Sequence, residues 1–202
     1  VNEEDTAVEE DTAIESDAET EWAGLRAIVP PQSLGGDPEA LCPEGFSNVS
    51  LSDGQHEGFD SSGQVRSFHL RTPDAEIHPG PRPVIIVFNG TGGNGAGAME
   101  SYHIQDFIDA GFVAIAPDSN GNGSIWPSWD GMHQDGDEEY PNPDLDFFDE
   151  LLACTGAHLD LDKNRLYIAG LSSGGIMTNY VLQRRSELLA GGIVASGILD
   201  FT

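Results

Sequence analysis

Basic side chains are scarce in this sequence. Its 202 residues include 8 lysines and arginines against 35 aspartates and glutamates, so the formal net charge is −27 and the isoelectric point is near 4.1. Only one of the basic residues is a lysine, Lys163. Nucleic acids and anionic membranes attract basic surfaces, so we expect neither as a partner. A surface so poor in lysine favours a saline environment, where salt screens the repulsion between like charges.

Long apolar runs are also missing, and cysteines are few. No stretch approaches the roughly 18 consecutive apolar residues of a membrane-spanning helix, so we expect no membrane span. The sequence starts at Val1 without a signal peptide, and we expect a processed form of an exported protein, secreted or tethered to the cell surface. Cys42 and Cys154 form a disulfide in such a protein or remain two thiols, and the sequence leaves both open.

Acidic residues crowd the first part of the chain. Between Val1 and Glu21 there are ten of them and no basic residue, a composition that predicts a disordered, solvated tail. Pro30-Pro31 and Gly35-Gly36 then mark a linker. We therefore interpret residues 1–37 as tail and linker and residues 38–202 as part of one domain.

Predicted strands and helices alternate along this domain. Apolar or alternating stretches predict strands at Asn48–Leu51, Val65–Arg71, Pro83–Phe88, Phe112–Ala116, Arg165–Ala169 and Gly192–Ala195. We expect the first two to be antiparallel edge strands, separated by a polar stretch. Helical stretches are expected at Ala98–Ala110, Leu145–Thr155 and Ser173–Leu188, and a long loop at 118–143. This alternation is typical of an α/β protein with a mostly parallel sheet flanked by helices.

The segment Gly170-Leu171-Ser172-Ser173-Gly174 fits the G-x-S-x-G pattern. It follows a predicted strand and precedes a predicted helix, which is the setting of a nucleophile elbow. Glycines at the first and last positions let the strand and the helix approach closely. We expect Ser172 to be a nucleophile and the backbone N–H of Ser173 to hold the oxyanion. The alternative is an ordinary Gly/Ser loop.

A second oxyanion donor is expected in the loop after the strand Pro83–Phe88. This loop reads Asn89-Gly90-Thr91-Gly92-Gly93-Asn94, and its glycines allow backbone N–H groups to face a substrate. The N–H of Thr91 or of Gly90 is the expected donor. An ordinary Gly-rich turn between a strand and a helix is the alternative.

Several of these segments together resemble a known family. The stretches Asp144–Phe148, Arg165–Tyr167 and Gly170–Met177, with the loop Phe88–Gly93, resemble the polyhydroxybutyrate depolymerase and feruloyl esterase group, which are secreted α/β-hydrolases. The resemblance covers about residues 65 to 200. It implies an α/β-hydrolase fold and cleavage of carboxylic esters through an acyl-serine intermediate, without a cofactor or metal. Asn89 stands where a histidine is usual in that group.

The acid and the histidine of a catalytic triad are missing from their usual places. In α/β-hydrolases both follow the serine in the chain, whereas all six histidines of this sequence precede Ser172. The acids after it are Glu187 and Asp200. We therefore expect the N-terminal portion of a longer enzyme, lacking the C-terminal strands and completed by a C-terminal portion of the same protein. Asp200 as the acid and His133 as the base are alternatives.

The long loop at 118–143 carries two further candidates. Trp126 and Trp129 either bind an apolar part of the substrate or pack the loop against the domain. The segment Asp118–Gly123 matches the start of a calcium-binding loop, but Trp129 occupies the position of the bidentate glutamate. An Asx/Gly turn is the preferred interpretation of that segment.

These observations favour a serine esterase. Its substrate, polymeric or not, is a polyester, a feruloyl ester or an acetylated carbohydrate. A serine peptidase on the same fold is the first alternative, because acyl-serine chemistry also cleaves amides. A hydrolase-like binding module without a complete triad is the second.

Overall fold

A six-stranded sheet forms the centre of the part of the chain that the structure describes. This computed structural model describes residues 31–120, 125–126 and 142–197. Within these ranges the strand order is β1-β2-β4-β3-β5-β6. β1 and β2 form an antiparallel hairpin, β2 pairs antiparallel with β4, and the remaining pairs are parallel. The strands are β1 (Gly54–Ser61), β2 (Gln64–Arg71), β3 (Arg82–Phe88), β4 (Val113–Pro117), β5 (Leu161–Leu171) and β6 (Gly191–Ala195).

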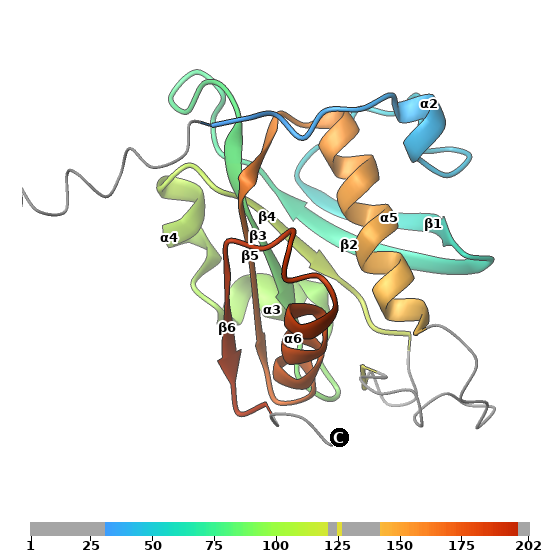
Figure 1. Ribbon diagram of the computed structural model, residues 1–202, viewed down its shortest axis with the longest axis vertical. Helices are drawn as coiled ribbons and strands as arrows, with labels where there is room; N and C mark the ends of the chain where they lie inside the picture. Colours follow the sequence, from blue (N-terminus) through green and yellow to red (C-terminus); the bar gives the residue numbers. More distant parts are fainter. Residues whose placement is uncertain (1–30, 121–124, 127–141, 198–202) are drawn as a thin grey trace, which may run out of the picture. The chain divides into compact units, whose positions relative to one another are not determined.

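Helices cover both faces of this sheet. The buried side chains of β3 alternate between two apolar clusters, with Ile86 and Phe88 in one and Ile85 and Val87 in the other. The first cluster is completed by α5 (Pro143–His158) and α6 (Ser173–Arg184), and the second by α3 (Gly95–Ser101) and α4 (Ile104–Asp109). Figure 1 shows the two pairs of helices on the sheet. The predicted mostly parallel sheet flanked by helices is therefore confirmed.

The first predicted strand is wrong. Residues 48–51 form no strand, and β1 instead occupies the polar stretch that we expected to separate two strands. Its glycine and acidic residues lie on an edge strand, where only Phe59 and Ser61 are buried. Gly58, with φ +82, lies at a bulge between Glu57 and Phe59. The turn of the hairpin is Ser62-Gly63, two residues with positive φ.

Other boundaries differ from the sequence predictions by a few residues. The single helix expected at 98–110 is two helices, because the left-handed conformation of His103, with φ 52, interrupts the helical backbone. β5 begins at Leu161, before the expected Arg165, and α6 ends at Arg184, before the expected Leu188. The expected tail at residues 1–30, together with Trp129, His133 and Asp200, lies outside the described residues.

Residues 32–34, which we expected in the linker, contact the start of β5. The backbone N–H of Gln32 donates to Asp162 Oδ1 at 3.0 Å, and Leu34 N–H donates to the carbonyl of Leu161 at 2.6 Å. The Leu34 side chain fills the space beside Gly156 on α5, where an added Cβ would collide with it. The short helix α2 (Pro38–Leu41) follows.

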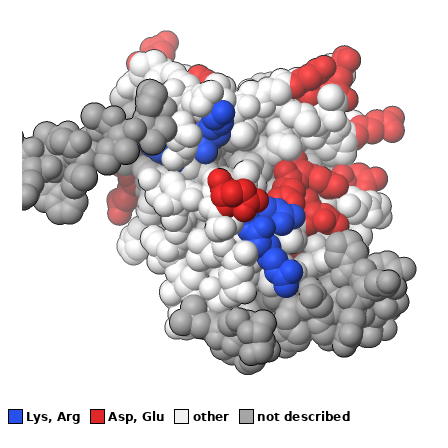
Figure 2. All heavy atoms as spheres, in the orientation of Figure 1, with Lys and Arg blue, Asp and Glu red and all other residues white. Residues whose placement is uncertain are grey.

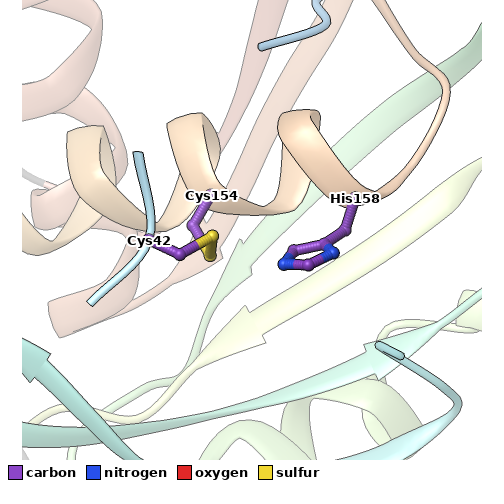
Figure 3. A group of neighbouring side chains, drawn as sticks. All are labelled: Cys42, Cys154 and His158. Atoms are coloured by element: carbon purple, nitrogen blue, oxygen red, sulfur yellow. A yellow bond between two sulfur atoms is a disulfide. The ribbon is translucent and has the colours of Figure 1, made fainter. Parts of the chain in front are cut away.

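A disulfide joins Cys42, just after α2, to Cys154 on α5. It decides between the two alternatives that the sequence left open. Figure 3 shows the bond beside His158, one turn further along α5. His158 Nε2 lies 2.7 Å from the carbonyl oxygen of Phe46. The disulfide therefore fixes the segment before β1 to the helix that covers one face of the sheet.

Three arginines of the described residues pair with acidic side chains. Asp144 pairs with Arg66, and both side chains are fully buried. Asp162 pairs with Arg165 at 2.5 Å, and Asp149 with Arg185 at 2.5 Å. Figure 2 shows acidic groups projecting at several places on one face of the molecule. None of the helices in the described ranges has the length and apolar character needed to cross a membrane.

Candidate active site

Ser172 lies at a sharp turn between a strand and a helix. β5 ends at Leu171 and α6 begins at Ser173, so a single residue makes the connection. Ser172 has φ 57 and ψ −121, a strained combination for a residue other than glycine, and its side chain is exposed. Its backbone is held on both sides: its N–H donates to the Ala195 carbonyl at 2.9 Å, and its carbonyl accepts from Ile176 N–H at 2.9 Å. This geometry is that of a nucleophile elbow.

Glycines permit the close approach that this turn requires. A Cβ on Gly170 would lie 2.5 Å from Thr178 Oγ1, and one on Gly174 would lie 2.6 Å from the carbonyl oxygen of Asn89. A Cβ on Gly175 would lie 2.6 Å from the carbonyl oxygen of Ala195. The start of α6 therefore contacts the backbone at the ends of β3 and β6 directly.

The structure brings one of the two predicted loop donors next to the serine. A Cβ built on Gly90 would lie 3.2 Å from the Leu171 carbonyl oxygen and 3.6 Å from Ser172 Cβ, so this loop contacts the elbow. Thr91, the next residue, is exposed. Ser173 is buried at the first position of α6, where a backbone N–H has no partner within the helix. The oxyanion roles of Gly90, Thr91 and Ser173 stay predictions.

Side chains from several elements hold the loop Asn89–Asn94. Tyr102 Oη donates to the Phe88 carbonyl at 3.0 Å, and Trp126 Nε1 donates to the Asn89 carbonyl at 2.9 Å. At the other end of the loop, Gly95 N–H donates to Asp118 Oδ1 at 2.6 Å. Burial raises the pKa of Tyr102, with the backbone N–H of Leu171 acting in the opposite direction, so the phenol remains a donor at neutral pH.

Asn89 also contributes to this loop through its side chain. Its Nδ2 donates to the carbonyl of Gly90 at 2.9 Å, and the same carbonyl accepts from the N–H of Gly93 at 2.9 Å. Asn89 is itself buried. The residue that stands in place of the usual histidine therefore fixes the conformation of the turn.

Trp126 lies in the core. Its side chain is 1% exposed and meets the Phe88 ring edge-on, with ring centroids 5.1 Å apart. Of the two alternatives from the sequence, the structure gives Trp126 the packing position rather than one open to substrate. A tryptophan inside a long loop carries no sequence signal that distinguishes these positions. Trp129 lies outside the described residues.

A buried ion pair lies at the same edge of the sheet and was not anticipated from the sequence. The guanidinium of Arg66 on β2 pairs with Asp144 at the start of α5 and donates to the Asp118 carbonyl at 3.2 Å. It also stacks over Phe147, 4.2 Å from the ring centroid. These contacts join the beginning and the end of the segment that connects β4 to α5.

The described histidines have contacts away from Ser172. His56 Nε2 lies 2.8 Å from the Ser52 carbonyl, and His69 Nε2 lies 3.9 Å from Asp118 Oδ2. Among the residues with described placement, no hydrogen bond links a histidine to Ser172. His133 and Asp200, the alternatives for base and acid, fall outside those residues.

Two groups of side chains bear on metal binding. Asp118 accepts hydrogen bonds from Gly95 N–H and, at 2.6 Å, from Ser67 Oγ, which lie 23 and 51 residues away in the sequence, so its carboxylate joins β2 and α3 to the end of β4. Residues 121–124 lie outside the described residues, so the calcium loop and the Asx/Gly turn both stay predictions. Cys42, Cys154 and His158 place their ligand atoms within 4.8 Å of one another (Figure 3). Because the two sulfur atoms are bonded to each other, this group offers no thiolate ligand.

Comparison with known proteins places this geometry in a family. Residues 98–202 match the prolyl oligopeptidase family (Peptidase_S9). An oxidized polyvinyl alcohol hydrolase from Pseudomonas sp is 31% identical over 185 residues, which cover 77% of this chain and 46% of that protein. A second one, from Sphingopyxis sp. (strain 113P3), is 30% identical over 183 residues, covering 79% and 49%. The chain thus spans about half the length of these curated relatives.

Solved structures with the same fold include native pOPH and an acetyl xylan esterase from Aspergillus awamori. The native pOPH structure is 26% identical, with a TM-score of 0.61, and the match covers 77% of this chain and 53% of that one. The acetyl xylan esterase is 20% identical, with a TM-score of 0.59 and coverage of 72% and 53%. The expected α/β-hydrolase fold is confirmed. Since the family match covers just over half of the sequence, the chain belongs to the prolyl oligopeptidase family of α/β-hydrolases.

Proposed function

We propose that this chain carries the nucleophile and the oxyanion site of a serine hydrolase that cleaves carboxylic esters. The observation that carries the proposal is the elbow. An exposed serine in a strained conformation, Ser172, is the single residue that connects β5 to α6, and Gly90 contacts it. A strained, exposed serine is kept only where the surrounding structure enforces it, and such sites concentrate at reaction centres.

The chemistry follows from the positions of the backbone groups. Ser172 Oγ attacks the ester carbonyl carbon while a base takes the hydroxyl proton. The electron pair of the C=O bond moves to oxygen, and the N–H groups of Ser173 and of Gly90 or Thr91 bind that oxyanion. When the carbonyl forms again, the alcohol leaves with the proton and Ser172 is acylated. Water then releases the acid by the same steps.

The base and the acid come from outside the residues that the structure describes. A histidine accepts the Ser172 proton, and an acid orients that histidine. We propose that both are supplied by a C-terminal portion of the same protein. The chain matches 46% of the length of one relative, which is consistent with this division.

The substrate class is an ester of a polymer or of a bulky acid. A relative at 31% identity is named for hydrolysis of an oxidized synthetic polymer, and solved structures of the same fold include acetyl xylan and ferulic acid esterases. Polyester, feruloyl and acetyl-carbohydrate esters are therefore the substrates to compare. We propose a secreted or surface-tethered enzyme, because a disulfide is typical of exported proteins.

Covalent labelling of the complete protein tests this proposal. A fluorophosphonate should label the wild type, and Ser172→Ala should abolish labelling. Ser196→Ala is the matched control, since Ser196 is also exposed, has φ 52 and lies at the end of the neighbouring strand β6. Labelling that survives in Ser172→Ala, or that is absent from the wild type, would refute the assignment.

A peptidase is the second candidate, and the family match favours it, because the family is that of prolyl oligopeptidase. Hydrolysis of p-nitrophenyl esters and of peptide anilides by the same preparation separates the two. We expect faster turnover of the esters. Faster turnover of the anilides would make the peptidase the better assignment.

A further inference from the structure

A buried tryptophan and a partly buried tyrosine donate to consecutive carbonyls at the end of β3. Tyr102, which follows α3, donates from Oη to the carbonyl of Phe88, and Trp126, in the loop after β4, donates from Nε1 to the carbonyl of Asn89. The two donors belong to different apolar clusters, Trp126 to that of α5 and α6 and Tyr102 to that of α3 and α4. The strand end is therefore held from both faces of the sheet.

Fixing these carbonyls also fixes the N–H groups that follow them. In a trans peptide the C=O of one residue and the N–H of the next point in opposite directions, and the described residues contain no cis peptide. The bond from Trp126 to the Asn89 carbonyl therefore turns the Gly90 N–H away from the indole. Two donors to the Gly90 carbonyl orient the Thr91 N–H in the same way.

The indole is itself rigidly placed. It is 1% exposed and packs edge-on against Phe88, so its N–H has one direction available. Oxyanion donors act through preorganisation, because a donor that is already in place needs no reorganisation as charge develops. The rigid indole of Trp126, bonded to the Asn89 carbonyl, holds the Gly90 N–H in place before charge develops.

We infer that Trp126 and Tyr102 are positioning residues for oxyanion binding that act without touching the substrate. Trp126 fixes the Asn89–Gly90 peptide, whose N–H is a proposed donor, and Tyr102 fixes the preceding carbonyl, that of Phe88, and with it the start of the loop. This rests on the proposed function, since it requires the N–H of Gly90 or Thr91 to bind an oxyanion. This role of Trp126 differs from substrate contact, one of the two alternatives that the sequence left open, and adds to the other, packing of the loop.

Removing each donor while keeping an aromatic ring at its position tests the inference in the complete protein. Trp126→Phe should lower kcat for p-nitrophenyl esters by about 10-fold, below the roughly 100-fold or greater loss for deleting an oxyanion donor itself, with KM changed less than about 2-fold. Tyr102→Phe, which removes one oxygen atom, should show a smaller loss of the same kind. The rate of fluorophosphonate labelling should fall in parallel with kcat.

Matched variants separate positioning from a loss of packing. Phe148→Leu removes ring packing against Phe88, in the cluster that also contains Trp126, without removing a donor. Tyr167→Phe repeats the Tyr102 change at another partly buried tyrosine of the cluster to which Tyr102 belongs. If Trp126→Phe and Phe148→Leu have equal kcat, the inference is wrong. It is also wrong if Trp126→Phe raises KM by an amount that depends on the acyl group, because that outcome indicates substrate contact.

The outcomes distinguish this inference from the proposed function. A wild-type protein that does not react with the fluorophosphonate removes both. A wild-type protein that reacts, with variants no slower than their controls, removes the inference alone. If Trp126→Phe does not fold, the comparison of Tyr102→Phe with Tyr167→Phe decides.

Discussion

Gly174→Ala should damage the site without changing any group that reacts. A Cβ at this position would lie 2.6 Å from the Asn89 carbonyl oxygen and closer still to that of Phe88. Both neighbours are backbone atoms at the end of β3, so neither can rotate away. Ordinary contacts of a Cβ begin near 3.4 Å. The start of α6 must therefore move away from the oxyanion loop by roughly 1 Å, taking Ser172 with it.

Two opposing effects set the size of the stability change. Overpacking of this kind costs about 1–3 kcal/mol. Alanine in place of glycine in a helix returns up to about 1 kcal/mol. We therefore expect the free energy of unfolding to fall by about 0–2 kcal/mol. The catalytic loss has no such offset, since a displacement of about 1 Å at a reaction centre costs on the order of 100-fold in rate.

The assay is kcat/KM on a p-nitrophenyl ester, measured with urea unfolding of the same preparations of the complete protein. Gly191→Ala on β6 is the matched control, because the nearest atoms to its added Cβ are Tyr167 ring carbons at 3.7 and 3.8 Å. It should retain the wild-type rate. A Gly174→Ala enzyme with kcat/KM within about 3-fold of this control would refute the argument that the approach of α6 to β3 positions the serine.

Stability measurements give four further tests. Replacing Cys42 and Cys154 by serine should lower the free energy of unfolding by about 2–5 kcal/mol in urea, because the disulfide spans 112 residues; equal midpoints would contradict this. Burial alone would raise the pKa of Asp162, but hydrogen bonds from backbone N–H groups and from Arg165 outweigh it and lower that pKa. Wild type should therefore lose stability as pH falls below about 4, and Asp162→Asn should lose less over that range. Burial and nearby carboxylates raise the pKa of Asp146, so Asp146→Asn should be the more stable protein at pH 7, with the difference vanishing at low pH. Added NaCl should raise the melting temperature, because the net charge is −27, and an unchanged melting temperature would contradict the inferred salt adaptation.

The parts of the fold that the sequence predicted are those with a strong local cause. The apolar run Pro83–Phe88 lies in a strand that is buried on both faces of the sheet. A continuous apolar run favours such a strand, because a strand with one face in water would expose half of its apolar side chains. The G-x-S-x-G segment predicted the elbow because steric contact demands glycine at Gly170 and Gly174.

The parts that it did not predict depend on long-range contacts. Half of the residues of β1 are glycine, aspartate or serine, which favour turns, and the segment is a strand because β2 pairs with it. No glycine or proline near His103 predicts the interruption between α3 and α4. The role of Trp126 depends on a carbonyl 37 residues away, and the pairing of Arg66 with Asp144 joins residues 78 apart. Neither contact has a local sequence pattern.

Residues 32–34, which contact the start of β5, set a limit for shortening the chain from its N-terminus. Gln32 supplies one of the donors to the buried carboxylate of Asp162, and Leu34 fills the space beside Gly156. A chain that begins at residue 38, where composition suggests the domain starts, would leave that carboxylate with one donor fewer and uncover apolar surface on α5. A chain that begins at Pro31 would keep both contacts. Expression of this domain should therefore start before Gln32.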